Sequence, residues 1–314
     1  MARSAGPDVG RGRAVLRRSL ELGLHTIGVP GVARWWRRGR VLILAYHNIV
    51  PDGAEPAGER SLHLPQREFA AQLDLLGETH RIIPLSSLWE PREERDRPCA
   101  VLTFDDGYRG AMTAGVQELA ARGVPGTFFV VPSFLGDHTF WWDALANPGD
   151  GTMPGDARVH ALEVLGGDDA AVRRWALDTG LPLGEMPAHA RSAAEDELKA
   201  AGTVPGIALE SHTWSHRSLS RIGPADLANE LRRSREWVRE HLGAAGEWCS
   251  CPYGDWSPGV AAAAAAAGYR GALRLDGGWV PEGVPAPFGT PRLNIPAGMS
   301  VGGFRLRIDG VMAR

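Results

Sequence analysis

Short apolar runs alternate along the chain with segments whose apolar residues recur at helical spacing. Apolar runs of strand length, bounded by Gly, Pro and polar residues, are typical of buried β-strands. The runs predicted as strands are 41–50, 99–104, 126–131, 206–212, 247–254, 269–275 and 291–295. Because helical segments fall between them, the pattern indicates repeated βα units around a parallel sheet.

The helical segments also carry start and stop signals. Helices are predicted at 65–78, from the end of the second strand to about residue 122, at 224–243 and at 258–268. Pro224 and Pro258 suit the first helical turn, and Gly243 and Gly268 suit the residue that follows a helix. The alanine run inside the last of these segments is therefore predicted to be a tightly packed helix.

One region interrupts the alternation. From about residue 139 to 205 the chain is polar, rich in Gly and Pro, and helical only in patches. This pattern predicts a helical insertion between consecutive strands of a barrel. Residues 40–314 are accordingly expected to form one domain, preceded by a basic helical segment at 1–39.

The N-terminal segment allows two interpretations. Two tryptophans stand among several arginines, in the order Arg34, Trp35, Trp36, Arg37, Arg38 and Arg40. The segment is either an amphipathic helix that contacts anionic lipid or a membrane protein, or a solvated helix at the edge of the domain. Neither a membrane span nor a signal peptide is evident in the sequence. A cytoplasmic enzyme with peripheral contact at the inner membrane face is the resulting hypothesis.

Charge and cysteine content exclude some classes of protein. The formal net charge of −3 argues against nucleic acid as a partner, because no domain-wide basic surface exists. The three cysteines, Cys99, Cys249 and Cys251, cannot form a disulfide framework and lack the usual spacing of a zinc pair. Ordinary reduced thiols are expected.

The segment "LTFDDGYRG" places two carboxylates, Asp105 and Asp106, directly after a predicted buried strand. Like charges repel, so this placement points to a bound metal ion or to acid–base chemistry. A second segment, "ESHTWSH", spaces His212 and His216 so that both imidazoles can reach one ion. Such a pair is more often incidental when it stands alone.

The two segments together change that assessment. Two histidines and one aspartate form an open zinc shell with a position left for water, and the second aspartate can then act as base. The carboxyl ends of parallel strands carry the functional residues of a βα barrel. Asp105, Asp106 and His212 fall at such ends, and His47 lies near another.

A third segment, "CPYGDW", contains a Pro–Tyr–Gly turn at residues 252–254. The turn is either an ordinary one, or it directs a backbone N–H at a developing oxyanion and packs the Tyr253 ring against substrate.

"TFDDG" (103–107), "HTWSH" (212–216) and "PYG" (252–254), in that order, resemble the polysaccharide deacetylases with the NodB homology domain, carbohydrate esterase family 4. "YHNI" (46–49), "GTFFV" (126–130) and "FWWD" (140–143) are similar to segments of its bacterial members. The resemblance extends over about residues 40–296.

The resemblance implies a distorted (β/α)₇ TIM-like barrel and removal of an N-acetyl group from an amino sugar in a polysaccharide or glycan precursor. Asp105 matches the catalytic base, and Asp106, His212 and His216 match the metal ligands. Pro252, Tyr253 and Gly254 match the turn at the substrate and oxyanion. One divalent ion is implied, with Zn²⁺ the default for this ligand set and Co²⁺ or Ni²⁺ as substitutes.

Two departures from the family pattern matter. Many members take the catalytic acid from a late histidine, but no histidine follows His241 here, so His47 is the candidate acid, as in a subset of relatives. Many members also place an arginine where this chain has Ser250. Arg292 is a candidate replacement that orients the base, or else it forms an ordinary surface ion pair.

Trp141 and Trp142 allow a sugar-stacking wall or a place in the core, and Asp143 is predicted to cap a helix. Two other kinds of hydrolase remain open, an O-acetyl esterase and an amidase on a non-carbohydrate substrate. A non-catalytic sugar-binding module is the alternative outside enzymes. The intact set of Asp105, Asp106, His212 and His216 argues against that module.

Overall fold

The computed structural model describes residues 29–92, 96–281 and 287–311. Within these ranges the strands form a large, mostly parallel sheet and a small two-stranded sheet. The strands of the large sheet are β1 (Arg40–Tyr46), β4 (Arg81–Ile82), β5 (Cys99–Phe104), β6 (Gly126–Val130), β7 (Ile207–Ser211), β8 (Trp248–Ser250), β9 (Gly271–Arg274), β10 (Trp279–Pro281), β11 (Phe288–Pro291) and β12 (Leu293–Asn294). The small sheet pairs β2 (Asn48–Val50) with β3 (His63–Pro65).

The large sheet nearly closes into a barrel. Its order runs β10-β1-β5-β6-β7-β8-β9-β11, and β12 returns to pair with β1 in parallel, with Leu293 opposite Leu44. One residue, Arg292, separates β11 from β12, so the two short strands together close the ring. The predicted TIM-like α/β barrel is thereby confirmed.

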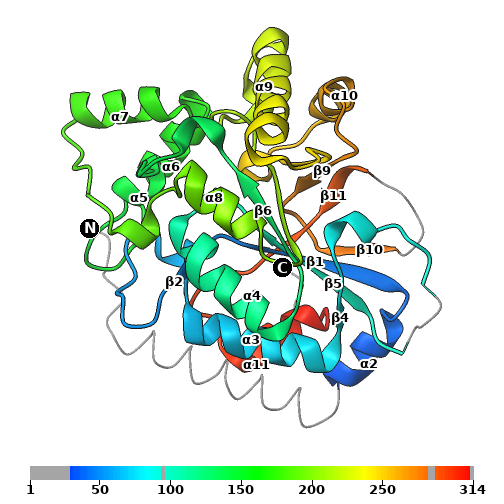
Figure 1. The fold of residues 1–314 in the computed structure, drawn as a ribbon. Helices are drawn as coiled ribbons and strands as arrows, with labels where there is room; N and C mark the ends of the chain where they lie inside the picture. The colour runs from blue at the N-terminus through cyan, green and yellow to red at the C-terminus, as the bar shows by residue number, and fades with distance from the viewer. Residues whose placement is uncertain (1–28, 93–95, 282–286, 312–314) are drawn as a thin grey trace.

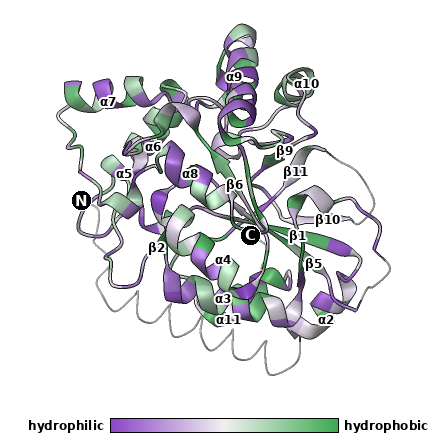
Figure 2. Cartoon of the chain, in the orientation of Figure 1, coloured by the Kyte–Doolittle hydropathy of each residue, from purple (hydrophilic) through white to green (hydrophobic). Residues whose placement is uncertain are grey.

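Helices surround the strands (Figure 1). They are α2 (Val29–Trp36), α3 (Gln66–Thr79), α4 (Val116–Arg122), α5 (Trp141–Ala144), α6 (Gly155–Val159), α7 (Asp169–Asp178), α8 (Glu195–Gly202), α9 (Pro224–Leu242), α10 (Pro258–Ala266) and α11 (Val301–Ile308). Helices such as α9 carry both hydrophilic and hydrophobic residues (Figure 2), as expected for amphipathic helices that cover a barrel. The alanine-rich segment is α10, which contacts α9 and β9.

The irregular segment lies between β6 and β7, where the sequence predicts an insertion. It carries α5, α6 and α7, which lie together at one side of the barrel in Figure 1. Its last helix, α8, contacts β7 and thus occupies the position of a regular barrel helix.

The predicted strand at 41–50 is wrong in one respect, because it is broken at His47. β1 ends at Tyr46, and the chain leaves the barrel to form β2, which pairs with β3. The apolar pattern runs through both strands, since each is buried, and so it conceals the break. The break places His47 at the carboxyl end of a barrel strand.

Three further predictions concern the whole chain. The three cysteines are buried. Among the described residues, no helix combines the length and the apolar character needed to cross a membrane. Most of the predicted N-terminal segment, residues 1–28, lies outside the described residues; its end is α2, where Trp35 and Trp36 are exposed.

Candidate functional site

The aspartate doublet follows β5 directly and is buried at the carboxyl end of the barrel. The backbone N–H of Asp105 donates to the Tyr46 carbonyl and extends the pairing of β5 with β1 by one residue. Asp106 and Gly107 then both adopt left-handed φ angles of 72°. For a non-glycine residue this conformation costs about 1–3 kcal/mol, and such strain is concentrated at functional sites. The turn separates the two carboxylates, which therefore contact different groups.

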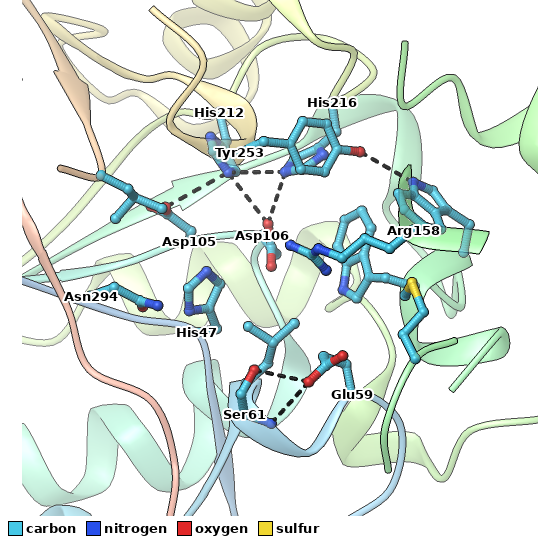
Figure 3. Close-up of a pocket in the computed structure, with 15 residues that line it drawn as sticks. His47, Glu59, Ser61, Asp105, Asp106, Arg158, His212, His216, Tyr253 and Asn294 are labelled. Carbon is cyan, nitrogen blue, oxygen red and sulfur yellow. Dashed lines mark hydrogen bonds and ion pairs between the residues drawn. The ribbon is translucent and has the colours of Figure 1, made fainter. Parts of the chain in front are cut away.

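Asp106, His212 and His216 converge on one point (Figure 3). Asp106 Oδ1 lies 3.3 Å from His212 Nε2 and 3.2 Å from His216 Nε2, and the two Nε2 atoms are 3.2 Å apart. Ligands at about 2.1 Å in a tetrahedral zinc shell are about 3.4 Å from one another. The three atoms therefore match one face of such a shell, and this set can hold a metal ion.

The hydrogen bonding of His212 supports the same conclusion. Its Nδ1 donates to the Ser250 carbonyl at 2.8 Å, so the neutral imidazole presents the lone pair of Nε2 to the cluster. Burial would lower the pKa of His212, but the Asp105 charge and the hydrogen bond with Asp106 raise it overall. The cluster thus attracts positive charge, which a metal ion or a proton can supply.

The pKa values of Asp106 and His216, the other two members of the cluster, are both lowered, but for different reasons. Burial opposes ionisation of Asp106, but its hydrogen bonds with His212 and His216 prevail and hold the pKa of this carboxyl well below its ordinary value. Burial lowers the pKa of His216 despite Asp106, so this imidazole is neutral, as a metal ligand must be.

Asp105 faces a different set of groups. Arg292 donates two parallel hydrogen bonds to its carboxylate, at 2.8 and 2.7 Å, and the Ser250 hydroxyl donates a third at 3.2 Å. Arg292 is fully buried and also donates to Thr103 Oγ1. A bidentate pair of this kind fixes the plane of a carboxylate. Arg292 therefore forms a buried pair with Asp105 and not an ordinary surface ion pair.

The charge of Arg292 also sets the protonation state of Asp105. Burial would raise the pKa of this carboxyl, but Arg292 and then His212 outweigh it, so the pKa lies below its ordinary value. Asp105 is an ionised, oriented carboxylate 3.8 Å from His212 Nε2. It can accept a proton from a group bound beside the cluster.

His47 and Asn294 line the other side of the same cavity, and both point into it in Figure 3. His47 follows β1, and Asn294 ends β12, which pairs with β1 so that Ala45 is opposite Asn294. Burial lowers the pKa of His47, against the opposing charges of Asp106 and Asp105. A lowered pKa makes the protonated imidazole a stronger acid, while it reduces the protonated fraction at neutral pH.

The cavity that contains these groups has a volume of about 440 Å³, within the range of about 300–1,000 Å³ typical of small-ligand sites. Tyr253 forms part of its wall from the Pro252–Gly254 turn, with a left-handed φ of 58°. Of the five non-glycine residues with positive φ in the described ranges, four lie in this site: Asp106, Thr213, His216 and Tyr253. Sequence patterns gave no sign of this shared strain.

The two tryptophans belong to the core and also line the cavity, so both alternatives expected from the sequence apply. Trp141 and Trp142 are buried members of the main core cluster and also line the cavity. The Trp142 ring lies 4.8 Å from that of His216, and Trp141 Nε1 donates to the Tyr253 hydroxyl. The edges of the two indole rings therefore face the cavity, while the rest of each ring packs in the core.

The prediction that Asp143 caps a helix is wrong. Phe140 precedes α5, and the Asp143 carboxylate instead accepts hydrogen bonds from the Glu59 N–H, the Tyr108 hydroxyl and His63 Nε2. This buried carboxylate links three segments of the cavity wall.

Several cavity residues were not identified from the sequence: Glu59, Ser61, Leu62, Met153, Arg158, Leu275 and Asn294. They lie on loops or in the insertion, without a motif of their own. Asn294 is the exception, because it lies near the carboxyl end of the predicted strand 291–295, where barrels carry functional side chains.

The carboxyl end of this βα barrel thus combines an Asp–His–His cluster that can hold a metal ion with a separately oriented carboxylate, an arrangement suited to hydrolysis. The protein-family model for polysaccharide deacetylases matches residues 92–272 of the 314. The chain therefore belongs to the polysaccharide deacetylase family, and it is a hydrolase that deacetylates carbohydrate. No match was found among curated protein sequences.

Solved structures agree with this fold. The deacetylase PplD of Streptococcus pyogenes, solved with acetate, is 16% identical over 83% of this chain and 94% of its own, with a TM-score of 0.57. IcaB from Ammonifex degensii is 18% identical over 81% and 91%, with a TM-score of 0.55. BC0361, a polysaccharide deacetylase from Bacillus cereus, is 17% identical over 84% and 67%, with a TM-score of 0.57. At these identities the structures support the fold alone.

Proposed function

We propose that this enzyme removes the N-acetyl group from an amino sugar in a polysaccharide or glycan precursor, and that a divalent metal ion is required. Asp106, His212 and His216 would hold the metal, whose chemistry is to lower the pKa of water and to polarise the acetyl carbonyl. The observation that carries the proposal is the triangle of donor atoms, with edges of 3.2, 3.2 and 3.3 Å, beside an oriented carboxylate.

In this mechanism Asp105 is the base. It accepts the proton of the attacking water, while Arg292 and Ser250 hold its carboxylate in place. The Arg292 charge keeps Asp105 ionised before the reaction, which favours the base form at neutral pH. The peptide N–H of Tyr253 would donate to the oxyanion of the tetrahedral intermediate, with Pro252 and Gly254 shaping the turn.

His47 is the acid. An amide breaks down only when its nitrogen is protonated as it leaves, so the site needs a donor separate from Asp105. His47 lines the cavity together with the doublet, and it comes from a different strand. Its depressed pKa assists the transfer to the nitrogen.

The test is acetate release from a panel of N-acetylated sugars and oligomers, together with metal analysis of the purified enzyme. His47→Ala should lower turnover by about 10²–10⁴-fold, the usual contribution of a positioned acid, with the metal content unchanged. Asp105→Asn serves as the inactive control. If His47→Ala loses metal, or keeps full turnover, the assignment of His47 is incorrect.

The same experiment addresses the other hydrolases. An O-acetyl esterase would release acetate from O-acetylated sugars and not from N-acetylglucosamine oligomers, and a non-carbohydrate amidase would accept neither. Metal analysis identifies the ion, with Zn²⁺ expected and Co²⁺ or Ni²⁺ as substitutes.

The proposal includes contact with a membrane surface through α2 on the cytoplasmic side. Trp35 and Trp36 are 55% and 74% exposed, and Arg38 stacks over Trp35. Exposed tryptophans beside arginines favour the interface of anionic lipid.

A further inference from the structure

The cavity contains the guanidinium of Arg158, which has no role in the proposed hydrolysis. Arg158 lies on α6, in the insertion, and Figure 3 shows its side chain directed into the cavity. Arg158 is exposed, and its guanidinium makes no hydrogen bond or ion pair with the described residues. In contrast, both terminal nitrogens of Arg292 in the same site donate hydrogen bonds, to Asp105, Ser250 and Thr103.

The acids of the cavity do not provide a partner for Arg158. Asp105 is neutralised by Arg292, and Asp106 is committed to the histidine cluster. Glu59, which also lines the cavity, accepts hydrogen bonds from the N–H and the hydroxyl of Ser61 (Figure 3). No oxygen of these carboxylates lies within ion-pair distance of Arg158.

The insertion anchors the backbone on either side of Arg158, whose side chain is exposed. The neighbouring residue Ala157 is buried, as is Ala161 one turn later. His160 stacks on Trp175 of α7 with ring centroids 4.4 Å apart, which fixes α6 against α7. A guanidinium on an anchored segment is a specific feature of the cavity wall, and its planar fork matches a carboxylate or a phosphate.

The chemistry of deacetylation does not account for this charge. The acetamide of the substrate is neutral, the proposed acid is His47, and the oxyanion develops at the histidine cluster. A negative charge elsewhere on the substrate would give this additional cation of the cavity wall a partner.

We infer that Arg158 forms a subsite for an anionic group of the substrate, so that this enzyme prefers an N-acetylated sugar that carries a carboxylate or a phosphate. The inference rests on the proposed function, because it concerns the sugar that the same cavity takes. The two sources share one chemistry, a planar or tetrahedral oxyanion that accepts hydrogen bonds from the guanidinium.

The experiment compares the binding of neutral and anionic sugars. Calorimetry on the Asp105→Asn protein would use N-acetylglucosamine, its 1-phosphate and 6-phosphate, N-acetylmuramic acid and the uronic acid of N-acetylglucosamine. At least one anionic sugar should bind about 10–100-fold more tightly than the neutral one, which is the range for a hydrogen bond to a charged group. A preference for the phosphates or for the carboxylates identifies the source of the charge.

Arg158→Gln should abolish this preference. The matched control is Arg174→Gln, which removes an exposed arginine of α7 in the same insertion that does not line the cavity. The control should keep the preference. In the active enzyme, Arg158→Gln should raise KM for the anionic sugars by a much larger factor than KM for the neutral sugar.

Three outcomes would overturn the subsite: equal binding of neutral and anionic sugars, an equal loss in Arg158→Gln and Arg174→Gln, or no binding of any panel member. An equal fall of kcat for neutral and anionic sugars would instead assign Arg158 to the reaction itself and would also refute the inference. Acetate release is scored separately, so a failure of deacetylation with retained anion preference would refute the proposed function and leave the subsite standing.

Discussion

The buried ionisable groups at the two ends of the barrel differ in their partners. At the amino end, the buried carboxylate of Asp309 accepts hydrogen bonds from Arg34 of α2, and the buried His80 contacts the Thr79 hydroxyl through Nδ1. At the carboxyl end, Asp106 and two histidines direct acceptor atoms at one another. The first set of groups includes a direct ion pair within the protein, whereas the second set can hold an added cation.

This difference separates structural from reactive ionisable groups. A buried polar group with a local partner contributes to stability, and its removal leaves that partner unpaired. A convergent cluster on a strained backbone is costly for the fold and is explained by what it binds. We therefore expect substitutions at the carboxyl end to affect metal content and turnover, and those at the amino end to affect unfolding.

The largest effect is expected from Asp106→Ala. Loss of one of three ligands should weaken metal binding by more than about 100-fold, beyond what the loss of an outer-shell contact causes, and should abolish acetate release. Asp105→Asn should retain the metal and lower kcat by about 10²–10⁴-fold. Metal analysis after dialysis and acetate release would be measured on both proteins. Full metal content in Asp106→Ala would contradict the ligand assignment.

The second prediction compares one arginine from each end. Arg292→Met leaves Asp105 buried and unpaired, which should reduce the free energy of unfolding by about 3–5 kcal/mol and also lower kcat. Arg34→Met should reduce the free energy of unfolding less, by about 1–3 kcal/mol, because Arg34 is partly exposed. It should leave kcat unchanged. Urea unfolding and steady-state kinetics would measure both quantities. A normal kcat in a folded Arg292→Met protein would remove the orienting role of this arginine.

The residues at the carboxyl ends of the strands could be predicted from the sequence more readily than the rest of the cavity wall, for a physical reason. Asp105, Asp106, His212 and His216 stand in short contiguous segments at strand ends, where the barrel topology alone brings them together. Arg158 reaches the cavity through the packing of an insertion, which no local pattern encodes.

Two failures have related causes. Apolar periodicity continues across the break at His47, because both flanking strands are buried. Asp143 stands at the start of a helix, where a cap is the common role, but three donors from distant segments determine its actual contacts. Long-range hydrogen bonds of this kind are decided by the folded structure.

The third prediction concerns pH and the amino end. Burial, with additional repulsion from Arg34 and Arg97, lowers the pKa of His80 to about 3, whereas an unfolded chain has a histidine pKa of about 6.5. Between these values the unfolded state binds a proton that the folded state does not, so stability falls as the pH drops below about 6.5. At pH 5 the loss should be about 2 kcal/mol relative to pH 7.

Urea unfolding at pH 5 and pH 7 would test this, with His80→Gln as the comparison. The variant should lose less stability between the two pH values, because one contribution to the acid sensitivity is gone, and its kcat at pH 7 should equal that of the wild type. An identical pH dependence in both proteins would show that His80 is not the group responsible.

The smallest effect is expected at α2, whose exposed Trp35 and Trp36 lie at the amino end and have no role in the reaction. Sedimentation with phosphatidylcholine vesicles, with and without phosphatidylserine, would measure membrane binding. The double variant Trp35→Ala/Trp36→Ala should bind several-fold less to the anionic vesicles and keep full activity on a soluble sugar. Leu177→Ala, which truncates an exposed apolar residue of α7, is the control and should bind as the wild type does. If binding is the same in all three proteins at low salt, α2 is a solvated helix at the domain edge, and the amino end of the barrel has only a structural role.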